Sequence, residues 1–180
     1  MGKSSVAKID PLIGVVLGSD SDLPVLAPGL KMLEDWAIPF EVHILSAHRT
    51  PEAAADYGRS AEVRGLQVLI AAAGMAAHLP GVLASYTTLP VIGLPVASGH
   101  LGGKDALYAI VQMPPGIPVA TVGINAGKNA ILLALEILAL ANPLYQDKLK
   151  AFRKEQAQGV LDKDAHLQER GFQGYGVART

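Results

Sequence analysis

Short apolar runs rich in Val and Ile alternate along this chain with longer segments in which Ala and Leu recur at helical spacing. This alternation is typical of βαβ units, in which a helix follows each strand and crosses back over the sheet. Most of the strand-like runs are apolar throughout, as expected for strands that helices cover on both faces. The pattern therefore predicts a parallel sheet between two layers of helices. The predicted strands are 12–17, 40–45, 67–72, 90–96 and 118–124, and the predicted helices are 22–37, 51–64, 76–86, 104–112 and 127–141.

Two of these segments carry local signals of their own. The run FEVHIL at 40–45 alternates, with Glu41 and His43 on one side, which favours an edge strand. Pro28 and Gly29 fall inside the first predicted helix, and both residues disfavour a helix interior. We therefore expect a kink or a break in that helix.

The C-terminal part of the chain predicts one more helix. The segment 143–158 is amphipathic, whereas 159–180 is polar, contains glycine and has no clear period. We expect this tail to be disordered or to lie on a neighbouring subunit. The predicted organisation is an N-terminal extension (1–11), one domain with a C-terminal helix (12–158) and a polar tail (159–180).

Composition narrows the class of partner. The 180 residues, half of them apolar, are enough for one core of ordinary size. A net charge of −1 creates no long-range field that would attract nucleic acid or an anionic membrane. There is no cysteine, and the five histidines lack the HExxH spacing, so we expect neither a metal nor another cofactor. The apolar runs are too short to span a bilayer, and we expect a cytoplasmic protein with a small-molecule partner.

Parallel sheets of this kind bind ligands at the carboxyl ends of their strands, near the point where the strand order reverses. The loops that follow the predicted strands are therefore the ones expected to bind a ligand. They are GSDSD (18–22), SAHRT (46–50), AGMAAHLPG (73–81) and ASGHLGGKD (97–105).

The first loop offers groups for a sugar phosphate. A glycine and the hydroxyls of Ser19 and Ser21 lead into a helix start, where free backbone N–H groups favour a phosphate. The alternative is that Ser21 or Asp22 merely caps the helix. A carboxylate repels phosphate but accepts hydrogen bonds from a ribose diol, so Asp22 would suit the sugar.

The second loop adds a cation and an imidazole. Arg49 has a rigid fork of donors that matches phosphate oxygens, and Ser46 supplies another hydroxyl. His48 lies between them and is the natural candidate for proton transfer near neutral pH. Taken alone, a loop histidine more often binds a backbone carbonyl. Its place in this cluster favours catalysis.

The third loop is small and apolar except for His78. Such a loop leaves room for a ligand close to the backbone and excludes water from a reactive intermediate. His78 would orient the ligand or His48, or it would be a buried structural histidine. The residues alone leave both readings open.

Six segments together resemble the N5-carboxyaminoimidazole ribonucleotide mutases of purine biosynthesis. They are GSDSD, SAHRTP, AAHLPG, LPVIGLPV, IVQMPPGIPVATV and KNAILLALEIL, which occur in the order and spacing of that family over about residues 12–158. The resemblance implies a flavodoxin-like three-layer α/β/α fold with a five-stranded parallel sheet and an extra C-terminal helix. It also implies a homo-octamer and transfer of a carboxylate from the exocyclic nitrogen to the ring carbon C4 of aminoimidazole ribonucleotide.

The resemblance carries over to individual residues. It implies His48 as general acid and base, with His78 beside it at the catalytic site. The remaining implied contacts serve binding: the phosphate is held by Ser19, Ser46 and Arg49, the ribose by Asp22, and the imidazole and carboxylate by the segment that contains Gly74, Ala77 and Leu79. Met75 and Ala106 depart from the family pattern, in which glycine and serine are common at these positions.

Two other functions stay open. The carboxylase branch of the family uses free carbon dioxide, but it usually has lysine after the SAH motif and Ser-Asn in place of AAH, so Arg49 and the AAHLPG segment favour the mutases. A non-catalytic flavodoxin-like module would bind a nucleotide without turnover. Flavin binding specifically would call for aromatic side chains, and Trp36 and most tyrosines lie outside the four loops.

Overall fold

The computed structural model describes residues 10–175. These residues divide into two units, the first ending at Leu138 and the second beginning at Ala139. The first unit contains five strands, β1 (Ile13–Leu17), β2 (Phe40–Ile44), β3 (Val68–Gly74), β4 (Val91–Val96) and β5 (Ala120–Thr121). Between them lie a short 3-10 turn η1 (Asp20–Asp22) and the helices α1 (Leu23–Asp35), α2 (Pro51–Ala61), α3 (Leu79–Ser85) and α4 (Lys104–Val111), and α5 (Gly127–Ala139) follows β5.

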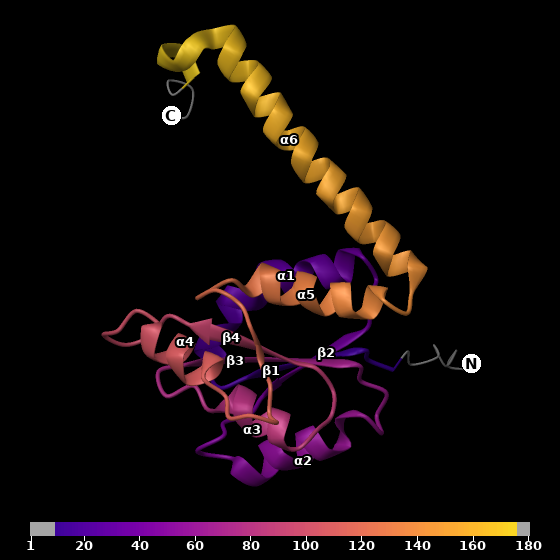
Figure 1. Cartoon of the computed structure of the whole chain (residues 1–180), viewed down its shortest axis with the longest axis vertical. Helices are drawn as coiled ribbons and strands as arrows, with labels where there is room; N and C mark the ends of the chain where they lie inside the picture. Colours follow the sequence, from indigo (N-terminus) through magenta and orange to yellow (C-terminus); the bar gives the residue numbers. More distant parts are fainter. Residues whose placement is uncertain (1–9, 176–180) are drawn as a thin grey trace, which may run out of the picture. The chain divides into compact units, whose positions relative to one another are not determined.

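All five strands are parallel and follow the order β2-β1-β3-β4-β5. This is the flavodoxin-like order, in which the chain reverses direction across the sheet between β1 and β3. Figure 1 shows α1 and α5 on one face of the sheet and α2 and α3 on the other. The predicted three-layer fold with a five-stranded parallel sheet is confirmed.

The core lies where helices cover the central strands on both faces. Every residue of β1 and β4 is buried, as are all residues of β3 except Gly74. The strand β2 lies at the edge of the sheet, as predicted from its sequence, but its burial does not alternate, because Val42 and Ile44 are exposed as well as His43. Its Glu41 accepts hydrogen bonds from Tyr57 and Arg64, at 2.8 and 2.6 Å, which tie this edge to α2 and the turn that follows it.

The first helix runs through Pro28 and Gly29 without the expected break. A Cβ on Gly29 would lie 2.6 Å from Cγ1 of Ile131, so the glycine lets α1 pack closely against α5. Pro28 removes one backbone hydrogen bond, but the buried face of the helix keeps it intact. Tertiary packing therefore overrides the local preference.

The other predicted strands and helices agree with the structure to within a few residues, except for the strand predicted at 118–124 and the helix predicted at 143–158. The predicted strand 118–124 is reduced to two paired residues, because Pro118 has no N–H and an edge strand has a partner on one side only.

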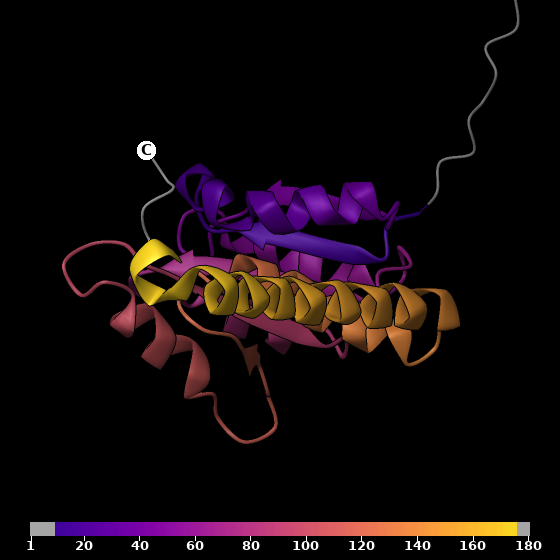
Figure 2. The ribbon, with the colours of Figure 1, turned by 90° about the horizontal axis from the view of Figure 1, so that it is seen from above.

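The second unit contains α6 (Pro143–Tyr175), which is 17 residues longer than the predicted helix 143–158. A break in helical geometry at Gly171, with φ at 68°, turns its C-terminal end aside, as the yellow part of the ribbon shows (Figures 1 and 2). The tail predicted from 159 onward is therefore helical up to Tyr175. Residues 176–180 and most of the predicted N-terminal extension lie outside the described residues, and the domain boundaries stay a prediction.

Among residues 10–175, no helix combines the length and the apolar character needed to cross a membrane.

Candidate active site

Loops from four strand ends line one cavity of about 500 Å³. The loop after β1 contributes Gly18, Ser19, Ser21 and Asp22; the loop after β2 contributes Ser46, Ala47, His48 and Arg49; the β3 end and its loop contribute Ala73, Gly74, Met75, Ala76 and Leu79; and the loop after β4 contributes Ser98. The cavity thus lies at the carboxyl ends of the strands, on both sides of the point where the sheet order reverses. This is the position expected from the sequence.

The first loop is held by a capping box, in which the residues at the start of η1 bond to one another. The Ser19 hydroxyl accepts a hydrogen bond from the Ser21 amide, and the Asp22 carboxylate accepts one from the Ser19 amide at 3.2 Å. Gly18 extends the pairing of β1 with β3, since its amide donates to the Ala72 carbonyl at 2.9 Å. The phosphate and ribose candidates Ser19 and Asp22 are therefore held on a short rigid turn.

Asp22 is the buried polar residue among those described, with 5% of its surface exposed. Burial raises the pKa of its carboxyl group, hydrogen bonds from the Ser19 amide and the Ser21 hydroxyl offset part of that rise, and the charge of Asp20 adds to it. Asp22 nevertheless lines the cavity, and because each carboxylate oxygen can accept more than one hydrogen bond, the group can still accept from hydroxyl groups of a ligand.

The second loop is closed by its own threonine. The Thr50 hydroxyl accepts from the Ser46 amide at 2.9 Å and donates to the Ser46 carbonyl at 3.1 Å, which fixes the turn before α2. Thr50 is the residue before the helix, but its side chain does not bond to the first turn of α2.

Arg49 bridges the first two loops. Its backbone amide donates to the Ser46 hydroxyl at 3.2 Å, and its Nη2 donates to the Gly18 carbonyl at 3.3 Å. The guanidinium group therefore lies beside Ser46 at the entrance to the loop that carries Ser19. Ser19 follows one strand and Ser46 and Arg49 follow another, and the structure brings all three to one side of the cavity.

His48 reaches across the sheet to the loop after β3. Its Nε2 lies 2.7 Å from Nδ1 of His78, and the two rings meet edge to face with their centroids 4.9 Å apart. His78 is exposed in the single chain and does not itself line the cavity. Of the two readings that the sequence left open for His78, the contact with His48 is the one found, and a buried structural histidine is not.

Within the third loop, the predicted residues differ in what they expose. Gly74 and Leu79 line the cavity, whereas the Ala77 side chain is 1% exposed and packs in the core. Any contact of Ala77 with a ligand must therefore come from its backbone. Met75 has a positive φ of 52°, and its side chain, 58% exposed, forms part of the cavity wall.

Several lining residues were not singled out from the sequence. Ala47, Ala73 and Ala76 flank residues that were, and their place in the loop sequences is the signal for them. Ser98 had a weaker signal, as the first side chain with a hydroxyl after β4, in one of the four loops that follow the predicted strands. Within the described ranges, no cluster of three or more His, Asp or Glu side chains could hold a metal ion.

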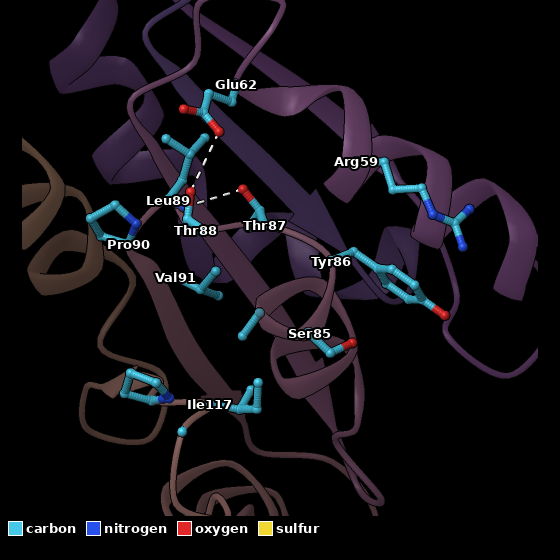
Figure 3. A pocket seen from close by; sticks show the side chains of 13 residues that line it. Arg59, Glu62, Ser85, Tyr86, Thr87, Thr88, Leu89, Pro90, Val91 and Ile117 are labelled. Atoms are coloured by element: carbon cyan, nitrogen blue, oxygen red, sulfur yellow. Dashed lines mark hydrogen bonds between the residues drawn. The ribbon is translucent and has the colours of Figure 1, made fainter.

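A larger cavity of about 910 Å³ lies at the opposite end of the strands, where β4 and β5 begin. The polar groups of this cavity contact one another (Figure 3): Thr88 donates a hydrogen bond to Glu62 at 3.4 Å, and the Arg59 guanidinium lies 4.5 Å from the centre of the Tyr86 ring. It contains no histidine. The carboxyl-end cavity, with its imidazole pair and guanidinium, is the candidate active site.

Comparison with known proteins identifies the family of the chain. Residues 12–159 match the family model described as AIR carboxylase. The chain is 52% identical over 165 residues to the N5-carboxyaminoimidazole ribonucleotide mutase of Pyrococcus horikoshii, which covers 92% of this chain and 93% of that protein. It is 51% identical over 165 residues to the phosphoribosylaminoimidazole carboxylase of Candida glabrata, again over 92% of this chain but over only 29% of that longer protein.

A solved structure shows the same fold. The crystal structure of Treponema denticola PurE superposes with a TM-score of 0.79 and 29% sequence identity, over 87% of this chain and 98% of that one. The resemblance read from the six sequence segments is thereby confirmed. The chain belongs to the AIR carboxylase family, in which it groups with the N5-carboxyaminoimidazole ribonucleotide mutases.

Proposed function

We propose that this enzyme converts N5-carboxyaminoimidazole ribonucleotide to 4-carboxy-5-aminoimidazole ribonucleotide in purine biosynthesis, with His48 as general acid and base. The observation that carries the proposal is the placement of His48, beside His78 and in the same cavity as Ser46, Arg49 and Asp22. A full-length mutase relative at 52% identity supports the same reaction.

The binding groups are proposed as follows. Ser19, Ser46 and Arg49 hold the phosphate, because two hydroxyls and a guanidinium converge where the first two loops meet. Asp22 accepts hydrogen bonds from the ribose hydroxyls. The imidazole ring and its carboxylate lie against Gly74, the backbone of Ala77 and the side chain of Leu79.

The reaction needs one proton carrier. His48 gives a proton to the exocyclic nitrogen as the bond from that nitrogen to the carboxyl carbon breaks, and the bonding electrons stay on nitrogen. Carbon dioxide is released into the cavity. The ring carbon C4 then uses an electron pair to bond to carbon dioxide, and the C4 proton returns to His48. Each step leaves the histidine in the form that the other requires.

The small apolar residues of the third loop serve the intermediate. Carbon dioxide has no charge by which the protein could hold it, so it stays near C4 only if the cavity is small and water is excluded. Anchoring the phosphate on the first two loops keeps the ring carbon close to it at high effective concentration.

The experiment is turnover by the purified protein. The N5-carboxy substrate, supplied alone, should yield the C4-carboxylated product without metal, ATP or added bicarbonate. Product formed only from aminoimidazole ribonucleotide and bicarbonate would instead indicate a carboxylase, the activity named for the fungal relative. Tight binding of the nucleotide with no product would indicate a binding module. Assembly as an octamer and a cytoplasmic location stay predictions.

A further inference from the structure

Ser98 is placed with little freedom at the carboxyl end of β4. The amide of Asn125, a residue with a positive φ of 57°, donates to the Pro95 carbonyl at 2.9 Å, and its side-chain oxygen accepts from the Ala97 amide at 2.8 Å. These two bonds clamp the backbone on both sides of Val96. Ser98 follows directly, so its position is fixed by a loop that lies outside the cavity.

The neighbouring strand leaves room for the Ser98 side chain. A Cβ on Gly74, at the end of β3, would overlap the Ser98 hydroxyl oxygen and would lie 3.1 Å from its Cβ. The absence of a side chain at Gly74 therefore lets this hydroxyl lie against the β3 backbone at the cavity wall. In the part of the chain that the structure describes, the hydroxyl forms no hydrogen bond, so its donor is available to a ligand.

The two ends of the cavity differ in chemistry. Hydroxyl, carboxylate and guanidinium groups come from the loops after β1 and β2, whereas the β3 end supplies Ala73, Gly74, Met75, Ala76 and Leu79, which have no side-chain hydrogen-bond donor. Two strand spacings, about 10 Å, separate β1 from β4. A nucleotide anchored by its phosphate at β1 thus extends its base toward β3 and β4, where Ser98 is the side-chain donor.

We infer that the Ser98 hydroxyl donates a hydrogen bond to an oxygen of the migrating carboxyl group, and that this hydrogen bond persists after the group has been released as carbon dioxide. This inference rests on the proposed mutase function and adds a residue to it. Ser98 carries no proton in the reaction. It keeps carbon dioxide facing C4, so that recapture by C4 is faster than escape to water.

The test is Ser98→Ala with Ser85→Ala as the matched control. The Ser85 hydroxyl donates to the Val82 carbonyl within α3 at 2.7 Å and lines the opposite cavity, so its loss should leave turnover unchanged. Two quantities are measured on the N5-carboxy substrate: the ratio of C4-carboxylated product to decarboxylated aminoimidazole ribonucleotide, and the incorporation of ¹³C from labelled bicarbonate into product.

For Ser98→Ala we expect kcat to fall by about 10-fold, the loss that one hydrogen bond to a charged group brings, with KM changed by less than about 3-fold. The share of decarboxylated product and the ¹³C incorporation should both rise above the wild-type values. Wild-type product ratio and labelling in this variant would overturn the inference, as would a fall in rate explained by a lower thermal unfolding midpoint. If the wild-type protein itself forms no product from the substrate, the proposed function fails and this inference fails with it.

Discussion

Nε2 of His48 lies 2.7 Å from Nδ1 of His78, a hydrogen bond between residues 30 positions apart in the sequence. A neutral imidazole has one N–H, so one ring donates in this bond and the other accepts. The accepting ring must therefore present a nitrogen without a proton, so the contact ties the tautomer of one ring to that of the other. Nδ1 of His48 is left outside the pair in either arrangement, and it is the nitrogen that we assign to the substrate.

Replacing His48 with Asn should reduce kcat by a factor of about 100 to 10,000, the contribution of a positioned acid and base. Substrate binding, measured separately, should stay near wild type. Asn is polar and of similar size, so the loop should keep its shape. His100→Asn is the control, because His100 is exposed and does not line the cavity. Near-wild-type turnover of His48→Asn would transfer the proton role to another residue.

Replacing His78 with Ala should act on His48 rather than on the substrate. The variant loses the partner that fixes the orientation and tautomer of the His48 ring, so we expect kcat to fall by about 10-fold with KM little changed. The diagnostic measurement is rescue by His78→Asn, whose side-chain amide lies near the position of the imidazole Nδ1 and can keep the hydrogen bond to His48, so it should recover part of the lost rate. An equal loss of kcat in both variants would show that His78 has only a packing role.

Replacing Arg49 with Ala should weaken substrate binding by roughly 2 to 4 kcal/mol, because a charged donor to the phosphate is lost. A substrate analogue without the phosphate should bind both proteins equally. Arg59→Ala is the matched control, since Arg59 forms an ion pair with Asp56 and contacts Tyr86 at the opposite cavity. Calorimetric titration separates the cases, and equal weakening for both ligands would make Arg49 structural.

The sequence could predict the sheet because the physical cause is local. Strands covered on both faces must be apolar throughout, and the glycine, proline and hydroxyl residues that end them mark the loops. Once the strands are parallel, their carboxyl ends share one edge, so Ser19, Ser46 and His48 could be expected in one site without knowledge of their contacts.

What the sequence could not predict depends on contacts across the chain. The packing of Gly29 on Ile131 explains why α1 does not break, and neither residue signals the other in sequence. The length of α6 was missed because most of its residues after 158 are exposed and give no apolar period, although Ala, Gln, Glu and Lys favour a helix. Ser98 was missed for a similar reason, since its place depends on Asn125 and Gly74.

The packing at Gly29 predicts opposite effects for two glycine substitutions in helices. Gly29→Ala adds a Cβ 2.6 Å from the buried Ile131 side chain, and such overpacking costs about 1 to 3 kcal/mol of unfolding free energy. Gly159→Ala on α6 meets no atom within 4 Å, so it should gain up to about 1 kcal/mol from helix propensity. Denaturant unfolding measures both, and stabilisation by Gly29→Ala would contradict the close packing of α1 on α5.

The buried carboxyl group of Asp22 predicts a conflict between stability and binding. Burial is the main cause of its raised pKa, so the folded state binds this proton more tightly than the unfolded state. The contribution of this group to the free energy of unfolding is therefore greatest at a pH below 3.8, the ordinary pKa of the carboxyl group. That contribution falls as the pH rises through the raised pKa of the folded state.

Asp22→Asn should remove that decline, because an amide does not ionise and still accepts the hydrogen bond from the Ser19 amide. Unfolding free energy measured across mildly acidic to neutral pH should be flatter than in wild type and higher at neutral pH. Substrate binding should weaken at the same time, since the amide group has one acceptor oxygen instead of two, and that oxygen already accepts from the Ser19 amide. Asp20→Asn, an exposed neighbour that does not line the cavity, should keep most of the pH dependence and the binding. A wild-type slope in Asp22→Asn would show that another group causes it, and unchanged affinity would remove Asp22 from the ribose site.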